Sequence, residues 1–192
     1  MLNVVIFGAP GSGKGTQSEN IINRYGLHHI STGEVLRKEI DSASELGKIA
    51  DSFISKGNLI PDDLMLKVLE TYLDRHAAQL EKGIIFDGFP RTVPQAVALE
   101  KLMTARNTTV HAVIGLDVPE DELINRMIER GRQSGRADDT PETIKNRLDV
   151  YHKSTAPLKS YYTDEGKYFP VNGHGDVMQI FDDIALILDK LH

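Results

Sequence analysis

Short apolar runs alternate with longer amphipathic stretches along the chain. Five runs are mostly apolar and rich in β-branched residues, which is typical of strands buried on both faces of a sheet. The predicted strands cover residues 2–7, 27–31, 83–87, 111–118 and 167–172. Between them, hydrophobic residues recur at spacings of three and four, which predicts helices. The alternation predicts an α/β fold with a five-stranded, doubly wound parallel sheet.

The helical stretches carry start signals in their side chains. Ser31 with Glu34, and Thr92 with Gln95, match the capping-box pattern, and Asp176 precedes the last amphipathic stretch as an N-cap. We therefore expect helices that begin near residues 14, 31, 44, 62, 92, 119, 140 and 176.

Two segments depart from the strand–helix alternation. Residues 31–60 hold helices without an intervening strand, which indicates an insertion beside the sheet that could serve as a substrate flap. Residues 131–139 are polar, with two glycines and no large apolar side chain, which predicts a short loop over the cleft. The predicted organisation is one domain over residues 1–192, with a core at 1–30, 61–128 and 140–192, a flap at 31–60 and a short lid at 129–139.

The first predicted strand leads into a glycine-rich loop. Gly8 and Gly13 are separated by four residues and followed by Lys14, the spacing of a phosphate-binding loop between a strand and a helix. Backbone N–H groups and the helix N-terminus would face an anion there, and Lys14 adds a full charge. Thr16 offers a hydroxyl one place later than usual, because Gly15 occupies that slot. The rival dinucleotide fingerprint fails, because it would need glycine in place of Thr16.

Composition limits the classes of function that remain. A net charge of −6 argues against a broad nucleic-acid surface. The chain has no cysteine, which excludes disulfides, thiolate zinc sites and cysteine nucleophiles. No run of 18 apolar residues occurs, and Gly8, Pro10 and Lys14 interrupt the apolar start, so we expect neither a membrane span nor a signal peptide. A soluble, cytoplasmic protein is the expectation.

The third predicted strand ends in an acid, Asp87, beside the loop. In phosphate-loop proteins such an acid orients Mg²⁺, often through water. Arg91 follows in a tight turn, and two further arginines, Arg130 and Arg147, have no acid three or four residues away. Because a site for anionic substrates needs fixed positive charge, these three arginines are expected to contact phosphates. From the residues alone, nearby acids favour surface ion pairs for three others: Arg37, Arg126 and Arg136.

Four motifs together resemble adenylate kinase. They are residues 8–16, residues 31–37, residues 86–91 with Gln95, and residues 135–139. The first motif alone indicates only a phosphate loop, but the set of four, in this order over nearly the whole chain, is highly specific to nucleoside monophosphate kinases.

The resemblance implies a role for each matching position. ATP with Mg²⁺ would contact Gly11, Ser12, Gly13, Lys14, Gly15, Thr16, Arg130 and the backbone of Gly175, with Asp87 holding Mg²⁺ through water. AMP would contact Thr32, Arg37, Asn58, Leu59, Ile60, Gly88, Phe89, Pro90, Arg91, Gln95, Arg136 and Arg147. The residues implied in catalysis are Lys14, Arg37, Arg91, Arg130, Arg136 and Arg147. Gln95 would read adenine, although a capping box also explains it, and Gly175 also suits a plain turn.

The resemblance also implies a reaction. The short segment at 131–139 is similar to the short-lid branch of the family. Long-lid relatives insert a small domain there, sometimes with a cysteine zinc cluster, and no such zinc site is expected in this chain. ATP and AMP would give two ADP by direct in-line attack in a Mg²⁺-dependent monomer that maintains adenine nucleotide levels. Thr32 and Gln95 favour AMP over UMP or CMP. Two alternatives stay open: a UMP/CMP kinase, and a nucleotide-binding switch whose base-reading motifs are not apparent.

Overall fold

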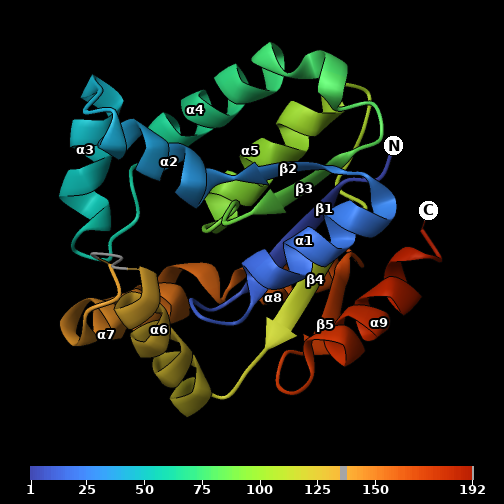
Figure 1. Ribbon diagram of the computed structural model, residues 1–192. Helices are drawn as coiled ribbons and strands as arrows, with labels where there is room; N and C mark the ends of the chain where they lie inside the picture. The colour runs from blue at the N-terminus through green and yellow to red at the C-terminus, as the bar shows by residue number, and fades with distance from the viewer. Residues whose placement is uncertain (135–137, 192) are drawn as a thin grey trace.

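A central parallel sheet organises the fold (Figure 1). The computed structural model describes residues 1–134 and 138–191. Within these residues five strands form one sheet in the order β2-β3-β1-β4-β5. Their bounds are β1 Val4–Gly8, β2 His28–Ser31, β3 Ile84–Asp87, β4 Ala112–Asp117 and β5 Tyr168–Asn172. The predicted doubly wound parallel sheet is confirmed, with strand ends within about two residues of those expected.

The helices follow the expected order. They are α1 Lys14–Tyr25, α2 Thr32–Asp41, α3 Glu45–Ile54, α4 Asp62–Arg75, α5 Val93–Thr104, α6 Glu120–Ser134, α7 Pro141–Val150, α8 Leu158–Asp164 and α9 Val177–Leu188. The predicted N-caps are present: Ser31, Thr92 and Asp176 each accept hydrogen bonds from backbone N–H groups of the first helical turn.

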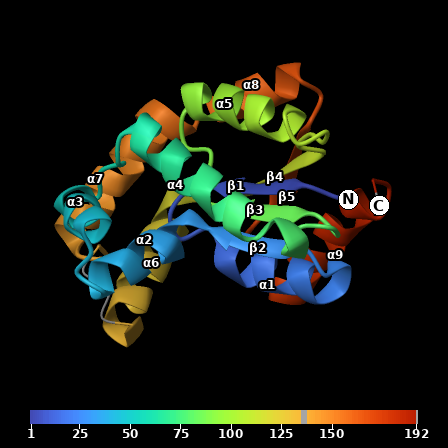
Figure 2. The same cartoon turned by 90° about the horizontal axis from the view of Figure 1, so that it is seen from above.

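Helices cover both faces of the sheet, as Figure 2 shows. Successive residues of β1 point to opposite faces. Val4 and Ile6 pack with hydrophobic residues of α1 and α9, whereas Val5 and Phe7 pack with those of α4, α5 and α8. The two resulting cores hold the strands in place, so the positions at which the strands end are well defined.

The strand register brings three chain segments to one edge of the sheet. Because all strands are parallel, their carboxyl ends lie together, and ligands of such sheets bind outside that edge. Ile6 near the end of β1 lies opposite Asp87, and Ser31 at the end of β2 also lies opposite Asp87. The glycine-rich loop, the start of α2 and the turn after β3 therefore meet at this edge.

Beyond this edge of the sheet, the predicted flap contacts α7. The Asn146 side chain on α7 donates to the Lys56 carbonyl at 2.6 Å and to the Asn58 side-chain oxygen at 2.9 Å. The predicted flap is therefore tied to α7 across the carboxyl edge of the sheet.

The prediction that residues 131–134 are loop is wrong. Helix α6 continues to Ser134. Gln133 donates to the Glu129 carboxylate one turn earlier at 2.8 Å, and the Ser134 hydroxyl donates to the Arg130 carbonyl at 2.7 Å. These polar residues extend the helix through contacts that the hydrophobic pattern does not reveal. The rest of the predicted loop includes residues 135–137, which lie outside the described residues.

We predict that Gly47→Ala destabilises the protein. Gly47 is buried on α3, and a Cβ there would lie 2.0 Å from the Glu39 carbonyl oxygen of α2. Helix propensity alone would favour alanine by up to about 1 kcal/mol. The steric conflict with backbone should outweigh it and lower the free energy of unfolding by about 1–3 kcal/mol, measured by urea denaturation.

Ser52→Ala is the matched control, because Ser52 is exposed on the same helix. It should leave stability within about 0.5 kcal/mol of wild type. A Gly47→Ala variant that gains stability would show that α2 and α3 are not packed this closely.

Candidate active site

The loop between β1 and α1 has the backbone of an anion site. Gly11 and Gly13 have φ angles of 85° and 92°, which side-chain-bearing residues rarely adopt. Helix α1 begins at Lys14, so its first N–H groups, which have no partner within the helix, face the loop. The Lys14 ammonium folds back and donates to the carbonyls of Gly8 at 2.8 Å and Ala9 at 2.9 Å.

Lys14 is surrounded by other cations. Burial is the largest cause that lowers the pKa of its ammonium from 10.5 to about 8. The charges of Arg91, Arg147 and Arg130 act in the same direction, and Asp87 opposes them. A site that disfavours its own positive charge in this way is suited to bind anions, because an anion would restore the charged form.

Asp87 supplies negative charge beside this cluster. It ends β3, and its side chain is largely buried. Burial alone would raise the pKa of the carboxyl, but His29, Lys14 and Arg91 together bring that pKa below its ordinary value. The His29 Nε2 lies 3.7 Å from a carboxylate oxygen. Asp87 is therefore ionised at neutral pH, and it is a hard oxygen ligand of the kind that Mg²⁺ prefers.

Arg91 lies in the turn that follows β3. Its Nε donates to the Gly88 carbonyl at 2.7 Å, and its own carbonyl accepts from the Thr155 hydroxyl at 2.8 Å. Burial lowers the pKa of Arg91, and the nearby charges of Arg147 and Arg37 lower it further. Anchored from both ends, the guanidinium is held at the cavity.

Arg130 and Arg147 form ion pairs with acids that the sequence pattern did not assign to them. Asp139, whose side chain is fully buried, binds Arg130 through two bonds, Nε–Oδ2 at 2.6 Å and NH2–Oδ1 at 2.7 Å. The Asp139 Oδ1 also accepts from Arg147 NH1 at 2.6 Å, and Asp138 lies 3.1 Å from the same nitrogen. This pairing raises the pKa of Arg130.

The inference that these two arginines lack acidic partners is therefore wrong. It considered only the positions three and four residues away. The acids lie eight and nine residues away, where the chain turns between α6 and α7. Two adjacent acids directly before the Thr140 cap were the available signal. The predicted phosphate contacts of Arg130 and Arg147 are a separate matter and stay predictions.

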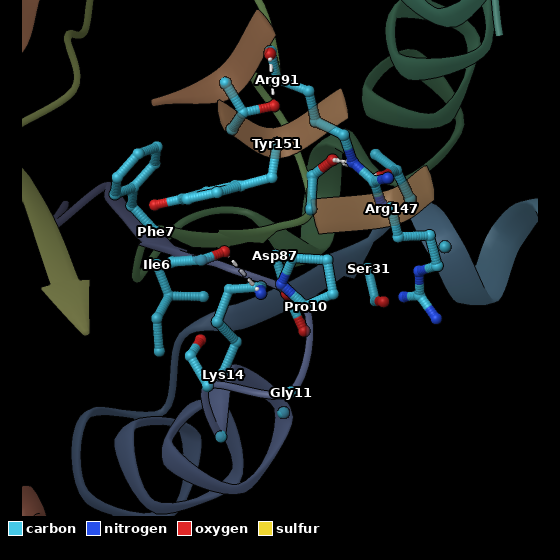
Figure 3. Close-up of a pocket in the computed structure, with 18 of the residues that line it drawn as sticks. Ile6, Phe7, Pro10, Gly11, Lys14, Ser31, Asp87, Arg91, Arg147 and Tyr151 are labelled. Carbon is cyan, nitrogen blue, oxygen red and sulfur yellow. Dashed lines mark hydrogen bonds between the residues drawn. The ribbon is translucent and has the colours of Figure 1, made fainter. Parts of the chain in front are cut away.

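One cavity of about 710 Å³ collects nearly all of the predicted site residues. Figure 3 shows Lys14, Asp87, Arg91 and Arg147 around it. The predicted residues that line it are Gly11, Ser12, Gly13, Lys14, Gly15, Thr16, Thr32, Arg37, Asn58, Leu59, Ile60, Asp87, Gly88, Pro90, Arg91, Gln95, Arg130, Arg147 and Gly175. Phe89 does not line the cavity, because its side chain packs in the core. Arg136 lies outside the described residues.

Arg126 and Tyr151 are among the cavity-lining residues that had not been assigned to the site. Arg126 makes the ion pair with Glu122 that its spacing indicated, at 2.8 Å, but it also lines the cavity and donates to the Gly173 carbonyl at 3.3 Å. Tyr151 begins a π-helical turn, Tyr151–Thr155, that extends α7. Because Arg126 lies one helical turn before Arg130, its position in the sequence could have indicated that it also lines the cavity. The π turn has no clear signal in the sequence.

Gln95 is only half of a capping box. Its backbone N–H donates to the Thr92 hydroxyl at 3.2 Å, as the pattern indicates. Its side-chain oxygen, however, accepts from the backbone N–H of Arg91 at 2.7 Å, and its amide nitrogen donates to Asp62 at 2.7 Å. The reciprocal bond to Thr92 is therefore replaced by contacts that hold the amide against the turn after β3.

A glycine-rich loop at the carboxyl edge of a parallel sheet, with buried arginines around it, defines a phosphate-loop protein that handles nucleotide phosphates. Comparison with known proteins identifies the group. The family model for adenylate kinase matches residues 6–167, and the chain belongs to the adenylate kinase family. It is accordingly a phosphotransferase enzyme.

Several full-length relatives carry the same name. The chain is 58% identical to an adenylate kinase of Parabacteroides distasonis over 184 residues, covering 96% of each chain. It is 56% identical to one of Bacteroides fragilis over 191 residues and all of both chains. It is 51% identical to one of Porphyromonas gingivalis over 194 residues, covering 99% of this chain and 97% of the relative.

Among the described residues, no helix has the length and apolar character needed to cross a bilayer. Within the same residues, no group of three or more His, Asp or Glu side chains is arranged to hold a metal ion.

We predict that Lys14 makes stability depend on pH. The pKa of Lys14 is about 8 in the folded protein and about 10.5 when the chain unfolds. Between these values the unfolded state binds the extra proton, so wild-type stability rises with pH relative to a Lys14→Met variant. From pH 7.5 to 9.5 the unfolding free energy of wild type should rise relative to that of Lys14→Met by on the order of 2 kcal/mol, measured by urea denaturation.

Lys48→Met is the control, because the Lys48 side chain is exposed on the flap. Its stability should run parallel to wild type over the same pH range. If Lys14→Met also ran parallel, the ammonium of Lys14 would not be disfavoured in the folded protein.

Proposed function

We propose that the protein catalyses the reversible transfer of a phosphoryl group from ATP to AMP, giving two ADP. The observation that carries the proposal is one cavity that is lined both by the phosphate loop and by the flap with the turn after β3. Two anionic substrates could therefore meet between them. Four cations line the same cavity: Lys14, Arg91, Arg130 and Arg147.

The chain would hold each nucleotide with different groups. The loop N–H groups and Lys14 would bind the ATP phosphates, with Arg130 and Gly175 on the same side. AMP would lie under the flap against Thr32, Arg37, Gln95 and the backbone of Asn58 to Ile60. Gly88 to Arg91, with Arg147 and Arg136, would hold its phosphate. These assignments rest on the motif resemblance and, for the described residues other than Phe89, on the cavity lining.

The chemical step needs positioning and charge stabilisation. An oxygen of the AMP phosphate attacks the γ-phosphorus of ATP, a P–O bond forms, and the bond between the γ-phosphorus and the bridging oxygen breaks, leaving ADP. A phosphate monoester is largely doubly ionised at neutral pH, so no general base has to remove a proton. Lys14 and the arginines would stabilise charge on the transferring group and on the departing ADP oxygen.

Mg²⁺ fits the residues present. Asp87 is an ionised, largely buried carboxylate at the cavity, beside the loop that would carry the ATP phosphates. Mg²⁺ bound with ATP would offset negative charge on the phosphates, and Asp87 would hold it through water. Within the chain, Asp87 also opposes the crowding of cations around Lys14.

Water has to be kept from the transferring group, because it would hydrolyse ATP instead. The contacts of Asn146 with Lys56 and Asn58 join the flap to α7 over the cavity. We infer that flap and lid close on the substrates in a cytoplasmic, monomeric enzyme.

We predict that AMP is the preferred acceptor. Gln95 offers an amide to the base, and leaving a buried polar partner unpaired disfavours binding by about 1–3 kcal/mol. With ATP and Mg²⁺, kcat/KM for AMP should exceed that for CMP and UMP by at least about tenfold, measured by ADP formation. Equal use of CMP would assign the protein to the pyrimidine kinases, and ATP turnover indifferent to AMP would favour a nucleotide switch.

We predict that Lys14→Ala keeps the fold and loses activity. Lys14 is the loop residue that brings a full positive charge to the phosphates, and removing one such donor lowers kcat by on the order of 100-fold. ADP formation and a thermal melt would measure both properties. Lys48→Ala removes an exposed lysine and should keep full activity. A folded Lys14→Ala variant with near-wild-type turnover would refute this role.

A further inference from the structure

Asp62 connects the end of the flap to the proposed base-reading residue. It opens α4 directly after Pro61, and both of its carboxylate oxygens accept hydrogen bonds from α5 and its cap. Oδ1 accepts from the Gln95 amide nitrogen at 2.7 Å, and Oδ2 accepts from the Thr92 hydroxyl at 2.9 Å. Gln95 is only 2% exposed and lines the cavity, whereas Asp62 does not line it.

These contacts fix which way the Gln95 amide faces. A carboxylate can only accept hydrogen bonds, so Asp62 requires the NH₂ group. The backbone N–H of Arg91 can only donate, so it requires the amide oxygen, which lies 2.7 Å away. Turning the amide over would set oxygen against oxygen at Asp62 and N–H against N–H at Arg91. Only one orientation satisfies both neighbours.

The fixed orientation leaves a defined pair of groups for a ligand. The amide nitrogen keeps one N–H, and the amide oxygen keeps one lone pair. The purine of AMP has a donating 6-amino group beside an accepting N1. The purine of inosine monophosphate has the reverse, an accepting 6-oxo group beside a donating N1–H. A glutamine free to turn over could pair with either base, whereas one held in a single orientation offers a fixed order of donor and acceptor.

We propose that Asp62 is a specificity-positioning residue, which holds the Gln95 amide in the orientation that accepts 6-aminopurine monophosphates and rejects 6-oxopurine monophosphates. The proposal rests on the proposed function, in which Gln95 meets the acceptor base. Asp62 acts through Gln95 and takes no part in phosphoryl transfer. Thr92 fixes the second carboxylate oxygen and thereby holds Asp62 itself in place.

The test compares two acceptors that differ only at this edge. In wild type and Asp62→Asn, kcat/KM is measured for AMP and for inosine monophosphate with ATP and Mg²⁺. Asparagine has the same shape but can present either an oxygen or an NH₂ group to Gln95. The ratio of the two values should fall by at least about fivefold, because one of the two restraints is lost. The KM for ATP should stay unchanged.

Asp63→Asn is the matched control, because Asp63 is exposed in the same first turn of α4 and contributes the same charge to the helix N-terminus. It should keep the wild-type ratio. Thermal melts check that each variant folds. Asp62→Ser is a second variant with the same expected loss, because its hydroxyl suits a first helical turn but is too short to reach Gln95.

A double-mutant cycle separates positioning from a general structural effect. In a Gln95→Ala background, Asp62→Asn should leave the ratio unchanged, because the amide through which Asp62 acts is gone. An unchanged ratio in folded Asp62→Asn, or an equal change in both backgrounds, overturns the proposal while the proposed function stands. A wild-type enzyme that does not prefer AMP over CMP overturns the proposed function and this inference together.

Discussion

Mutual repulsion among buried cations is the constraint on which the site depends. Around one cavity, the charges of Arg91, Arg130 and Arg147 lower the pKa of Lys14, and the charge of Arg147 lowers the pKa of Arg91. Such a cluster is tolerated only when negative charge lies within it, because a buried unpaired charge is strongly destabilising. Asp87 supplies that charge near Lys14 and Arg91, and Asp139 supplies it between Arg130 and Arg147. The acids therefore allow the cations to exist at this edge of the sheet.

Local patterns predicted most of the fold, because they are set by neighbouring residues. The apolar runs located all five strands, and side chains such as Ser31 and Asp176 located helix starts, since an N-cap acts within one turn. The loop from Gly8 to Lys14 was predictable for the same reason. The extension of α6 to Ser134 was missed because polar residues close that helix without a hydrophobic stripe.

Contacts between distant segments set the parts of the site that the sequence could not predict. The partners of Arg130 and Arg147 depend on how the chain returns from α6 to α7, and the second partner of the Gln95 amide lies 33 residues earlier, at Asp62. Phe89 belongs to a motif that matches the family, yet its side chain packs in the core. A motif identifies which backbone segment approaches a ligand, whereas the side-chain direction depends on how that segment crosses the sheet edge.

The hydrogen bonds of Lys14 explain how such a site can prefer an anion to its own internal pairing. Its ammonium donates to two neutral carbonyls, each bond contributing on the order of 1.5–3 kcal/mol at most. A nucleotide phosphate offers charged oxygens in the same place, so its bond to the ammonium adds a Coulombic attraction between full charges that a neutral carbonyl lacks. The carbonyl bonds hold the side chain at the loop, so less conformational freedom is lost when phosphate binds. Burial is the largest cause of the lowered pKa of Lys14, and it also strengthens the attraction of the ammonium to phosphate. A low-dielectric environment disfavours an isolated charge but strengthens the attraction between two opposite charges.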